Sequence, residues 1–309
     1  MSMLPPLLVA GSLALGTAVL IGPGPTWVAH WSFLRRVPRA AVVLWQAGAV
    51  AALFSIFGVA WLLGGATLRS GGAATGIAIL GVAALLFAGL VAVRLVWALA
   101  GVIAATGARR RRHRDLVDLL AAPLPADRTD LLGRLAGLRV LAEARPLAYC
   151  LPGLLRSRVV LSAGTLAVLS PQELTAVLAH EKAHLRARHD LVLATFDAVH
   201  QAFPHAIRSD LPAQQARLLV EMLADDAAVR AAGRAPLARA LVALSESVVP
   251  ESALGVARGS TLIRIQRLAE PGSASTPGSA AAAGLAAAIY LLAAVLVAAP
   301  VVALLAAVA

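Results

Sequence analysis

The chain has 309 residues, 60% of them hydrophobic, and a formal net charge of +11. Its mean hydropathy of +0.81 excludes an ordinary soluble protein and predicts that much of the chain lies in lipid. Because the arginines are scattered or lie beside apolar stretches, we expect the charge to face the lipid bilayer, and we expect no direct nucleic-acid binding. With one cysteine, Cys150, we expect neither an intramolecular disulfide nor a multi-cysteine metal site.

Four stretches are apolar and long enough to cross a bilayer, which takes about 20 residues per helix. They are residues 4–22, 40–64, 76–106 and 280–309. Arginines follow the first stretch at Arg35, Arg36 and Arg39 and the third at Arg109 to Arg112, so these two loops are predicted to be cytoplasmic. We therefore expect a multi-pass protein of the cytoplasmic (inner) membrane with both termini outside.

This pattern divides the chain into a membrane domain (1–107), a cytoplasmic domain (108–270), a linker (271–279) and a last membrane helix. Arg94 lies inside the third stretch, where a charge is a candidate functional residue. Since it lies in the cytoplasmic half, we favour an arginine that reaches toward the interface.

The polar block begins with a predicted helix over residues 115–143, interrupted by Pro123 and Pro125. Two short β-prone runs follow, 146–151 and 158–162, and they are bounded by Pro-Gly and Ala-Gly pairs. This spacing predicts a hairpin or a small sheet. Residues 190–206 form a second amphipathic segment, which we expect to pack in the core or to dock on the membrane.

A helix over residues 171–188 is strongly signalled by Ser170 as N-cap, Pro171 and Glu173, which together make a capping box. His180 and His184 are four residues apart, so both imidazoles lie on one face and can bind one Zn²⁺. Glu181 is the predicted catalytic base, because it can reach a metal-bound water from the side. The segment is typical of a zinc peptidase.

A catalytic zinc takes a third protein ligand. The candidates are His189, His200, His205, Glu221 and Asp225. Glu221 and Asp225 are one helical turn apart, so we assign Glu221 as the ligand and Asp225 as the residue that holds a ligand histidine through its N–H. Asp226 points elsewhere on the same helix and is expected to be a surface or capping charge.

These elements together resemble the peptidase domain of the BlaR/MecR family of membrane metallopeptidases. The matching features are the Pro152-Gly153 pair before a strand, the Ala163-Gly164 turn after it, the helix from Ser170 to Asp190, and the Glu221/Asp225 pair. The resemblance implies a mainly α membrane protein of four transmembrane helices, with a cytoplasmic α+β gluzincin-type metallopeptidase domain between the third and fourth. It also implies a zinc endopeptidase that cleaves a cytoplasmic partner, typically a winged-helix repressor.

Family members that sense antibiotics carry an extracellular penicillin-binding domain, whereas this chain ends at Ala309. Its single lysine, Lys182, is preceded at three residues by Ala179, so a Ser-x-x-Lys nucleophile is not expected. Shorter, sensorless members are the better comparison. We also expect that the strand Arg158, Val159, Val160, Leu161 and Ser162 either is a purely structural hairpin or binds substrate as an edge strand.

For the oxyanion, Tyr149, His200, His205 or an arginine are open alternatives. Two other functions are consistent with the motif. One is a quality-control or processing protease like HtpX or the CAAX prenyl proteases, in which membrane spans follow the metal helix more closely than here. The other is a catalytically inactive membrane scaffold, which would bind zinc below stoichiometry.

Overall fold

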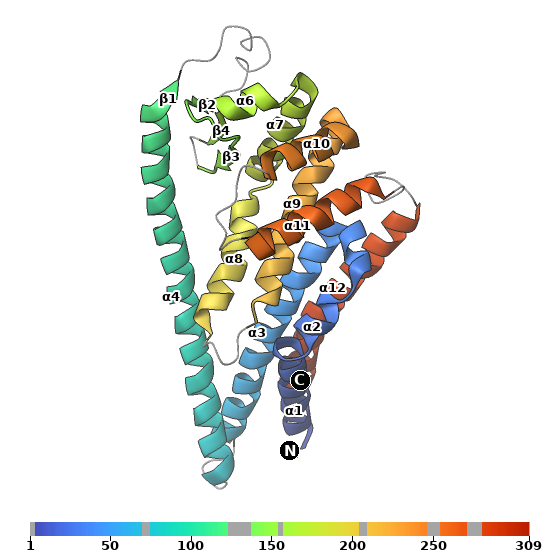
Figure 1. Ribbon diagram of the computed structural model, residues 1–309. Coiled ribbons are helices and arrows are strands. Elements are labelled where there is room, and N and C mark those ends of the chain that lie inside the picture. Colours follow the sequence, from blue (N-terminus) through green and yellow to red (C-terminus); the bar gives the residue numbers. More distant parts are fainter. Residues whose placement is uncertain are drawn as a thin grey trace. The chain divides into compact units, whose positions relative to one another are not determined.

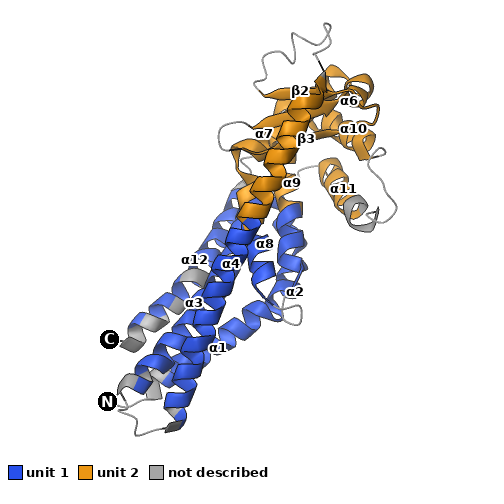
Figure 2. Cartoon of the chain, turned by 90° about the vertical axis from the view of Figure 1, so that its left-hand side faces the viewer, with its two compact units in different colours: residues 1–102, 195–217, 278–309 blue, residues 103–194, 218–277 orange. Residues whose placement is uncertain are grey.

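The computed structural model describes residues 4–69, 75–122, 137–153, 157–203, 209–245, 254–270 and 280–308. It is mostly helical with one small sheet (Figure 1). The chain divides into two compact units (Figure 2). Unit 1 comprises residues 1–102, 195–217 and 278–309, and unit 2 comprises residues 103–194 and 218–277. The predicted linker 271–279 lies outside the described residues, as do Pro123 and Pro125.

Unit 1 consists of apolar helices of different lengths. They are α1 (Leu4–Ile21), α2 (Gly24–Ala29), the short 3-10 helix η1 (Ser32–Arg36), α3 (Pro38–Arg69), the first part of α4 (Thr75–Leu120) and α12 (Ala280–Val308). Both α1 and α12 pack against α3. A Cβ atom added at Gly58 would lie 2.9 Å from the side chain of Leu13, so this glycine lets α1 and α3 approach closely.

Two helices in the described part of the chain are long and apolar enough to cross a membrane, Pro38–Gly65 and Ala78–Leu120. The apolar stretches of α1 and α12 are shorter, Leu7–Ile21 and Ala283–Val295. The structure therefore supports two of the four expected spans. Helix α4 also runs on without a break through the expected domain boundary at residue 107, because its arginine-rich segment continues the helical hydrogen bonding to Leu120.

Unit 2 contains a four-stranded sheet in the order β1-β2-β4-β3. The strands are β1 (Ala121–Ala122), β2 (Leu138–Leu141), β3 (Ala148–Leu151) and β4 (Arg158–Ser162). Strands β3 and β4 form the predicted antiparallel hairpin, while β2 pairs in parallel with β4. The helices that lie wholly in unit 2 are α6 (Ala163–Val168), α7 (Pro171–Arg186), α10 (Arg234–Ser245) and α11 (Leu254–Ala269). Helices α8 (His189–Ala202) and α9 (Leu211–Ala232) have residues in both units, since residues 195–217 belong to unit 1.

Strand β2 corrects two expectations. Residues 138–141 were expected at the end of a helix, but they form a strand with Leu138 and Val140 buried in alternation. Because β2 pairs with β4, the strand Arg158–Ser162 has a neighbour on each side and cannot be an edge strand. Among the described strands, β1 and β3 lie at the edges of the sheet, and β3, with four residues, is the longer of these two.

Candidate metal centre

Helix α7 carries the predicted zinc-binding histidines and the predicted catalytic glutamate. It begins with the capping box that the sequence predicted. The Ser170 hydroxyl accepts a hydrogen bond from the Glu173 backbone N–H, and the Glu173 carboxylate accepts one from the Ser170 N–H at 2.9 Å. The apolar face of the helix buries Leu174 and Leu178 against the sheet residues Leu138 and Leu161. Packing and capping together hold the following turns, which carry His180, Glu181 and His184.

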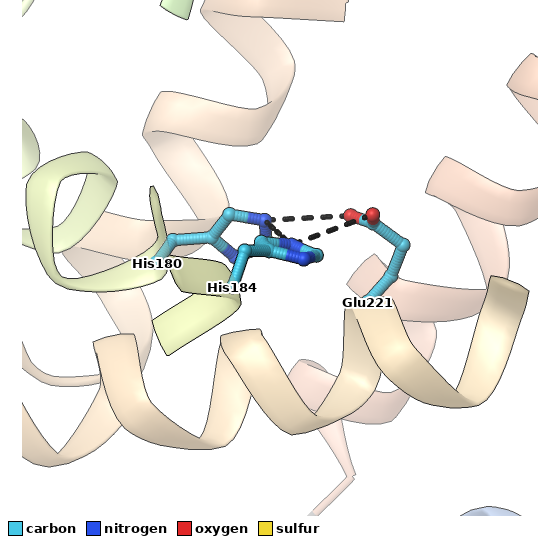
Figure 3. Close-up of side chains that lie close together, drawn as sticks. All are labelled: His180, His184 and Glu221. Atoms are coloured by element: carbon cyan, nitrogen blue, oxygen red, sulfur yellow. Dashed lines mark hydrogen bonds and ion pairs between the residues drawn. The ribbon is translucent and has the colours of Figure 1, made fainter. Parts of the chain in front are cut away.

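His180 and His184 from α7 converge on Glu221 from α9 (Figure 3). The two Nε2 atoms are 3.1 Å apart, and they lie 3.4 and 3.5 Å from the two oxygens of Glu221. Bonds of about 2.05 Å at tetrahedral angles place zinc ligands about 3.3 Å apart. The three residues therefore fit a zinc ion, and the side chain of Glu221 remains 36% exposed, so that solvent can reach it.

Behind the histidines, a second layer of polar side chains contacts the atoms that point away from the metal position. Nδ1 of His180 lies 3.1 Å from Oδ1 of Asp225, close but not aligned as a hydrogen bond. Nδ1 of His184 makes a 3.1 Å contact with Nδ1 of the buried His189. Because the Nδ1 atom of each histidine faces this layer, each Nε2 atom faces Glu221 and can be offered to a cation.

Arg264 of α11 contacts two of the acidic residues of α9, Glu221 and Asp225. Its Nε and NH2 donate to the carboxylate of Asp225 at 2.8 and 2.6 Å, and NH1 lies 3.0 Å from Glu221. The guanidinium is buried, so these contacts are only weakly screened by water. Arg264 therefore fixes the position of Glu221 and neutralises part of the negative charge of the pair.

The charges of the cluster shift its pKa values in opposite directions. Burial disfavours protonation of His180, but Asp225 and Glu221 outweigh it and raise its pKa to about 9 as long as no cation is bound. Burial lowers the pKa of His184 to about 4. For Glu221 and Asp225, burial is outweighed by His180 and Arg264, and each pKa falls to about 2. Both carboxylates are thus ionised at neutral pH and suited to a cation.

Glu181 differs from the other acids of the site, because burial raises its pKa above the ordinary value. The Cys150 thiol of the edge strand β3 lies near its carboxylate, and burial together with this negative charge raises the pKa of Cys150. Cys150 is therefore an un-ionised neighbour of Glu181, not a thiolate ligand.

The other expected candidates lie elsewhere. His200 pairs with Asp210 in unit 1. His205 lies outside the described residues. The Tyr149 hydroxyl contacts Nε2 of His113 at 3.0 Å. Asp226 is not a surface charge, as was expected, but pairs with the buried Arg267 at 2.8 Å.

Arg94 has a defined partner within unit 1, since its Nε donates to the backbone carbonyl of Ala202 at 2.7 Å. Arg94 therefore supplies a hydrogen-bond donor to one of the carbonyl groups that lack a partner within the helix at the C-terminal end of α8. Sequence patterns alone missed Arg264 and Arg267, which lie three residues apart on the amphipathic α11. The only signal available was that two arginines occupy neighbouring positions on one helical face.

Two histidines on one helix and a glutamate on a second, beside a buried glutamate of raised pKa, define the centre of a metallopeptidase. Residues 136–218 match peptidase family M48, a family that is typically zinc-dependent. The match covers most of the sheet, α7 and α8, and it ends three residues before Glu221. No curated protein matches the chain, and no solved structure matches it.

Proposed function

We propose that the chain is a membrane zinc endopeptidase that cleaves a cytoplasmic protein. The observation that carries the proposal is the spacing of His180, His184 and Glu221, whose ligand atoms are 3.1 to 3.5 Å apart. Two imidazoles and one carboxylate are the ligand set of a catalytic zinc with an open fourth position. The match of residues 136–218 to a peptidase family supports the same chemistry.

A bound zinc would polarise the scissile carbonyl and make water acidic enough to react near neutral pH. Glu181 is assigned as the base that takes the proton from the attacking water and hands it to the leaving amine. Its raised pKa suits both steps, because a carboxylate of low pKa is too weak a base to take the proton from water, whereas one of raised pKa can take the proton and still give it up to the amine. Asp225 orients His180, and Arg264 holds Glu221 in place.

Substrate is proposed to bind along β3. This strand pairs with β4 on one side only and contacts α7. An extended peptide added to its open edge would form main-chain hydrogen bonds, which are indifferent to most of the peptide sequence. Since Cys150 of β3 is close enough to Glu181 for the carboxylate to raise its pKa, a peptide in this position would pass near the catalytic base.

The membrane arrangement is proposed to contain four spans, with the peptidase residues in the cytoplasm and both termini outside. Helices α3 and α4 support it by length and apolarity. The arginines at 35, 36 and 39 and the run at 109–112 support the orientation, because cytoplasmic flanks are enriched in arginine. The resemblance to BlaR/MecR peptidases suggests a winged-helix repressor as substrate, in a response to antibiotic or cell-envelope stress.

An HtpX-like quality-control protease and an inactive scaffold are the alternatives. The test uses the full chain reconstituted in lipid, with two substrates offered in parallel: the winged-helix repressor encoded nearest to it and an unfolded membrane protein. Glu181→Gln removes the base, and Glu270→Gln is the matched control at an exposed position. Zinc content is measured in the wild-type protein and in both variants.

We expect one zinc per chain in each protein, and cleavage of the folded repressor that disappears in Glu181→Gln but not in Glu270→Gln. Loss of the base should lower the rate by about 10²- to 10⁴-fold. Cleavage of the unfolded protein alone would favour quality control. Sub-stoichiometric zinc without cleavage would favour the scaffold, and full activity of Glu181→Gln would refute the proposed mechanism.

A further inference from the structure

Unit 1 contains a cavity of about 170 Å³ that the peptidase chemistry does not use. Its wall is formed by the end of α1, by α2 and α3, by the last turns of α8 and by the start of α9. All lining residues belong to unit 1. The cavity is thus a feature of the apolar helices themselves.

The wall is almost wholly apolar. Among the described lining residues, the polar side-chain groups are the imidazole of His200, the hydroxyl of Ser209 and the indole N–H of Trp45. An apolar cavity of about 150 Å³ stays free of water and takes up a benzene-sized molecule. This slightly larger cavity is therefore suited to a hydrocarbon group on the order of six carbons or more.

One part of the wall is polar. His200 pairs with Asp210, whose carboxylate is exposed, and the Ser209 hydroxyl accepts a hydrogen bond from the Leu211 N–H. A ligand that fits this wall has a hydrocarbon body and a polar group near His200. This is the chemistry of an amphiphile and not of a polar metabolite.

We propose that the cavity binds the hydrocarbon chain of a membrane lipid, whose head group lies near His200 and Asp210. The inference rests on the proposed membrane placement of α3 and not on peptidase activity. Helix α3, which contributes Trp45 and Gly48 to the wall, is one of the two helices in the described residues that are long and apolar enough to span a bilayer. In a bilayer the chains of the lipids are the most concentrated apolar ligand, so even a weak site is filled by mass action.

The bound chain would stabilise the two helices that carry the cavity wall and part of the metal centre. Helix α8 contributes Phe196 and His200 to the wall and starts at His189, which contacts His184. Helix α9 contributes Ala213 and carries Glu221 farther along. Arg94 holds the last residue of α8 at its carbonyl. A filled cavity would therefore limit the motion of both helices.

Trp45 allows a direct test, because it lines the cavity and is only 7% exposed. The full chain is placed in nanodiscs of phosphatidylcholine, with or without bromine atoms along the acyl chains, which quench tryptophan only near contact. The fluorescence emission of Trp45 is obtained by subtracting the emission of the Trp45→Phe variant from that of the wild-type protein. We expect brominated chains to remove most of it.

Gly48→Leu should restore Trp45 emission, because Gly48 lines the cavity, a Cβ atom added there meets no atom within 4 Å, and the rest of the leucine side chain would occupy the space of the lipid chain. Gly89→Leu is the matched control, an equally open glycine at an exposed position of α4, and should leave the quenching unchanged. If Gly48→Leu does not assemble, the wild-type comparison alone decides.

Trp61 and Trp97 are 62% and 81% exposed and report whether the helices lie in lipid. If they are quenched and Trp45 is not, the cavity excludes lipid chains and the inference is wrong, even when the protein is an active peptidase. If none is quenched, the membrane placement and this inference fail together. Emission of Trp45 that changes with dissolved benzene but not with brominated lipid would assign the cavity to free small molecules and overturn the proposal.

Discussion

The two compact units differ in what they bury. In the part of the chain that the structure describes, every buried charged or imidazole side chain belongs to unit 2, whereas the buried polar residue of unit 1 is Ser55. Unit 2 offsets the cost of burying charge by pairing acids with Arg264 and Arg267. Unit 1 is built from apolar and small residues, and it retains a cavity. We therefore expect unit 2 to carry out the reaction and unit 1 to bind apolar groups.

The largest effect expected from this contrast concerns the metal ligands of unit 2. Glu221→Gln should lower zinc affinity by more than about 100-fold, because even changes behind the ligands cost 10- to 100-fold. Zinc affinity is measured by competition with a chelator. The same exchange at the exposed Glu270 should have no effect, and an unchanged affinity of Glu221→Gln would remove Glu221 from the ligand set.

The two buried arginines of α11 form a matched pair for the next prediction. Arg264→Met and Arg267→Met each remove a buried arginine from an ion pair with an acid of α9, so each should lower the free energy of unfolding by about 3–5 kcal/mol. Only Arg264 contacts Glu221, so only Arg264→Met should also lower zinc affinity, by about 10- to 100-fold. Equal zinc affinities of the two variants would show that Arg264 is purely structural.

Zinc affinity should also depend on pH in a way that His180 determines. With a pKa of about 9, His180 is protonated at pH 7 and must release that proton to bind zinc, whereas His184, with a pKa of about 4, is already neutral. Affinity should therefore rise about tenfold per pH unit between pH 7 and 9 and then level off. Calorimetry in two buffers should detect about one released proton.

Asp225→Asn is the control for this dependence. It removes one of the two acids that raise the pKa of His180, so the rise in affinity should shift to lower pH. Affinity that does not change between pH 7 and 9 in the wild-type protein would contradict the assigned protonation state.

The sequence predicted the parts of the metal centre that depend on local spacing. The capping box at Ser170 and Glu173 placed His180 and His184 on one helix, and Glu221 and Asp225 were correctly placed on a second helix, one turn apart. These features follow from helical periodicity and hydrogen bonding within a few residues. They required no knowledge of the tertiary fold.

Features that depend on contacts between distant segments were not predictable. Arg264 contacts Asp225, which is 39 residues away in sequence, and the spacing of Arg264 and Arg267 on one helical face does not indicate which acids they pair with. The inner position of β4 follows from β2, which the pattern assigned to a helix. The cavity of unit 1 likewise depends on how the wall helices pack and not on any one residue type.

The smallest expected effects come from glycine substitutions, which test whether side chains pack more closely in unit 2 than around the cavity of unit 1. At Gly164 in unit 2, an added Cβ would lie 2.0 Å from the backbone oxygen of Ala144. Since that backbone must move, Gly164→Ala should destabilise the protein by about 1–3 kcal/mol. At Gly48 in unit 1, an added Cβ meets no atom within 4 Å. Gly48→Ala should therefore stabilise the helix by about 0.5–1 kcal/mol, the usual gain of alanine over glycine.

Thermal unfolding in detergent measures both changes, and Gly89→Ala on α4 provides the reference gain at an exposed position without a cavity. Opposite signs at Gly164 and Gly48 would support close packing around the sheet and open space between the apolar helices. A loss of stability in Gly48→Ala would mean that the wall helices pack more closely than the cavity requires. The lipid-chain site would then lack the volume on which it depends.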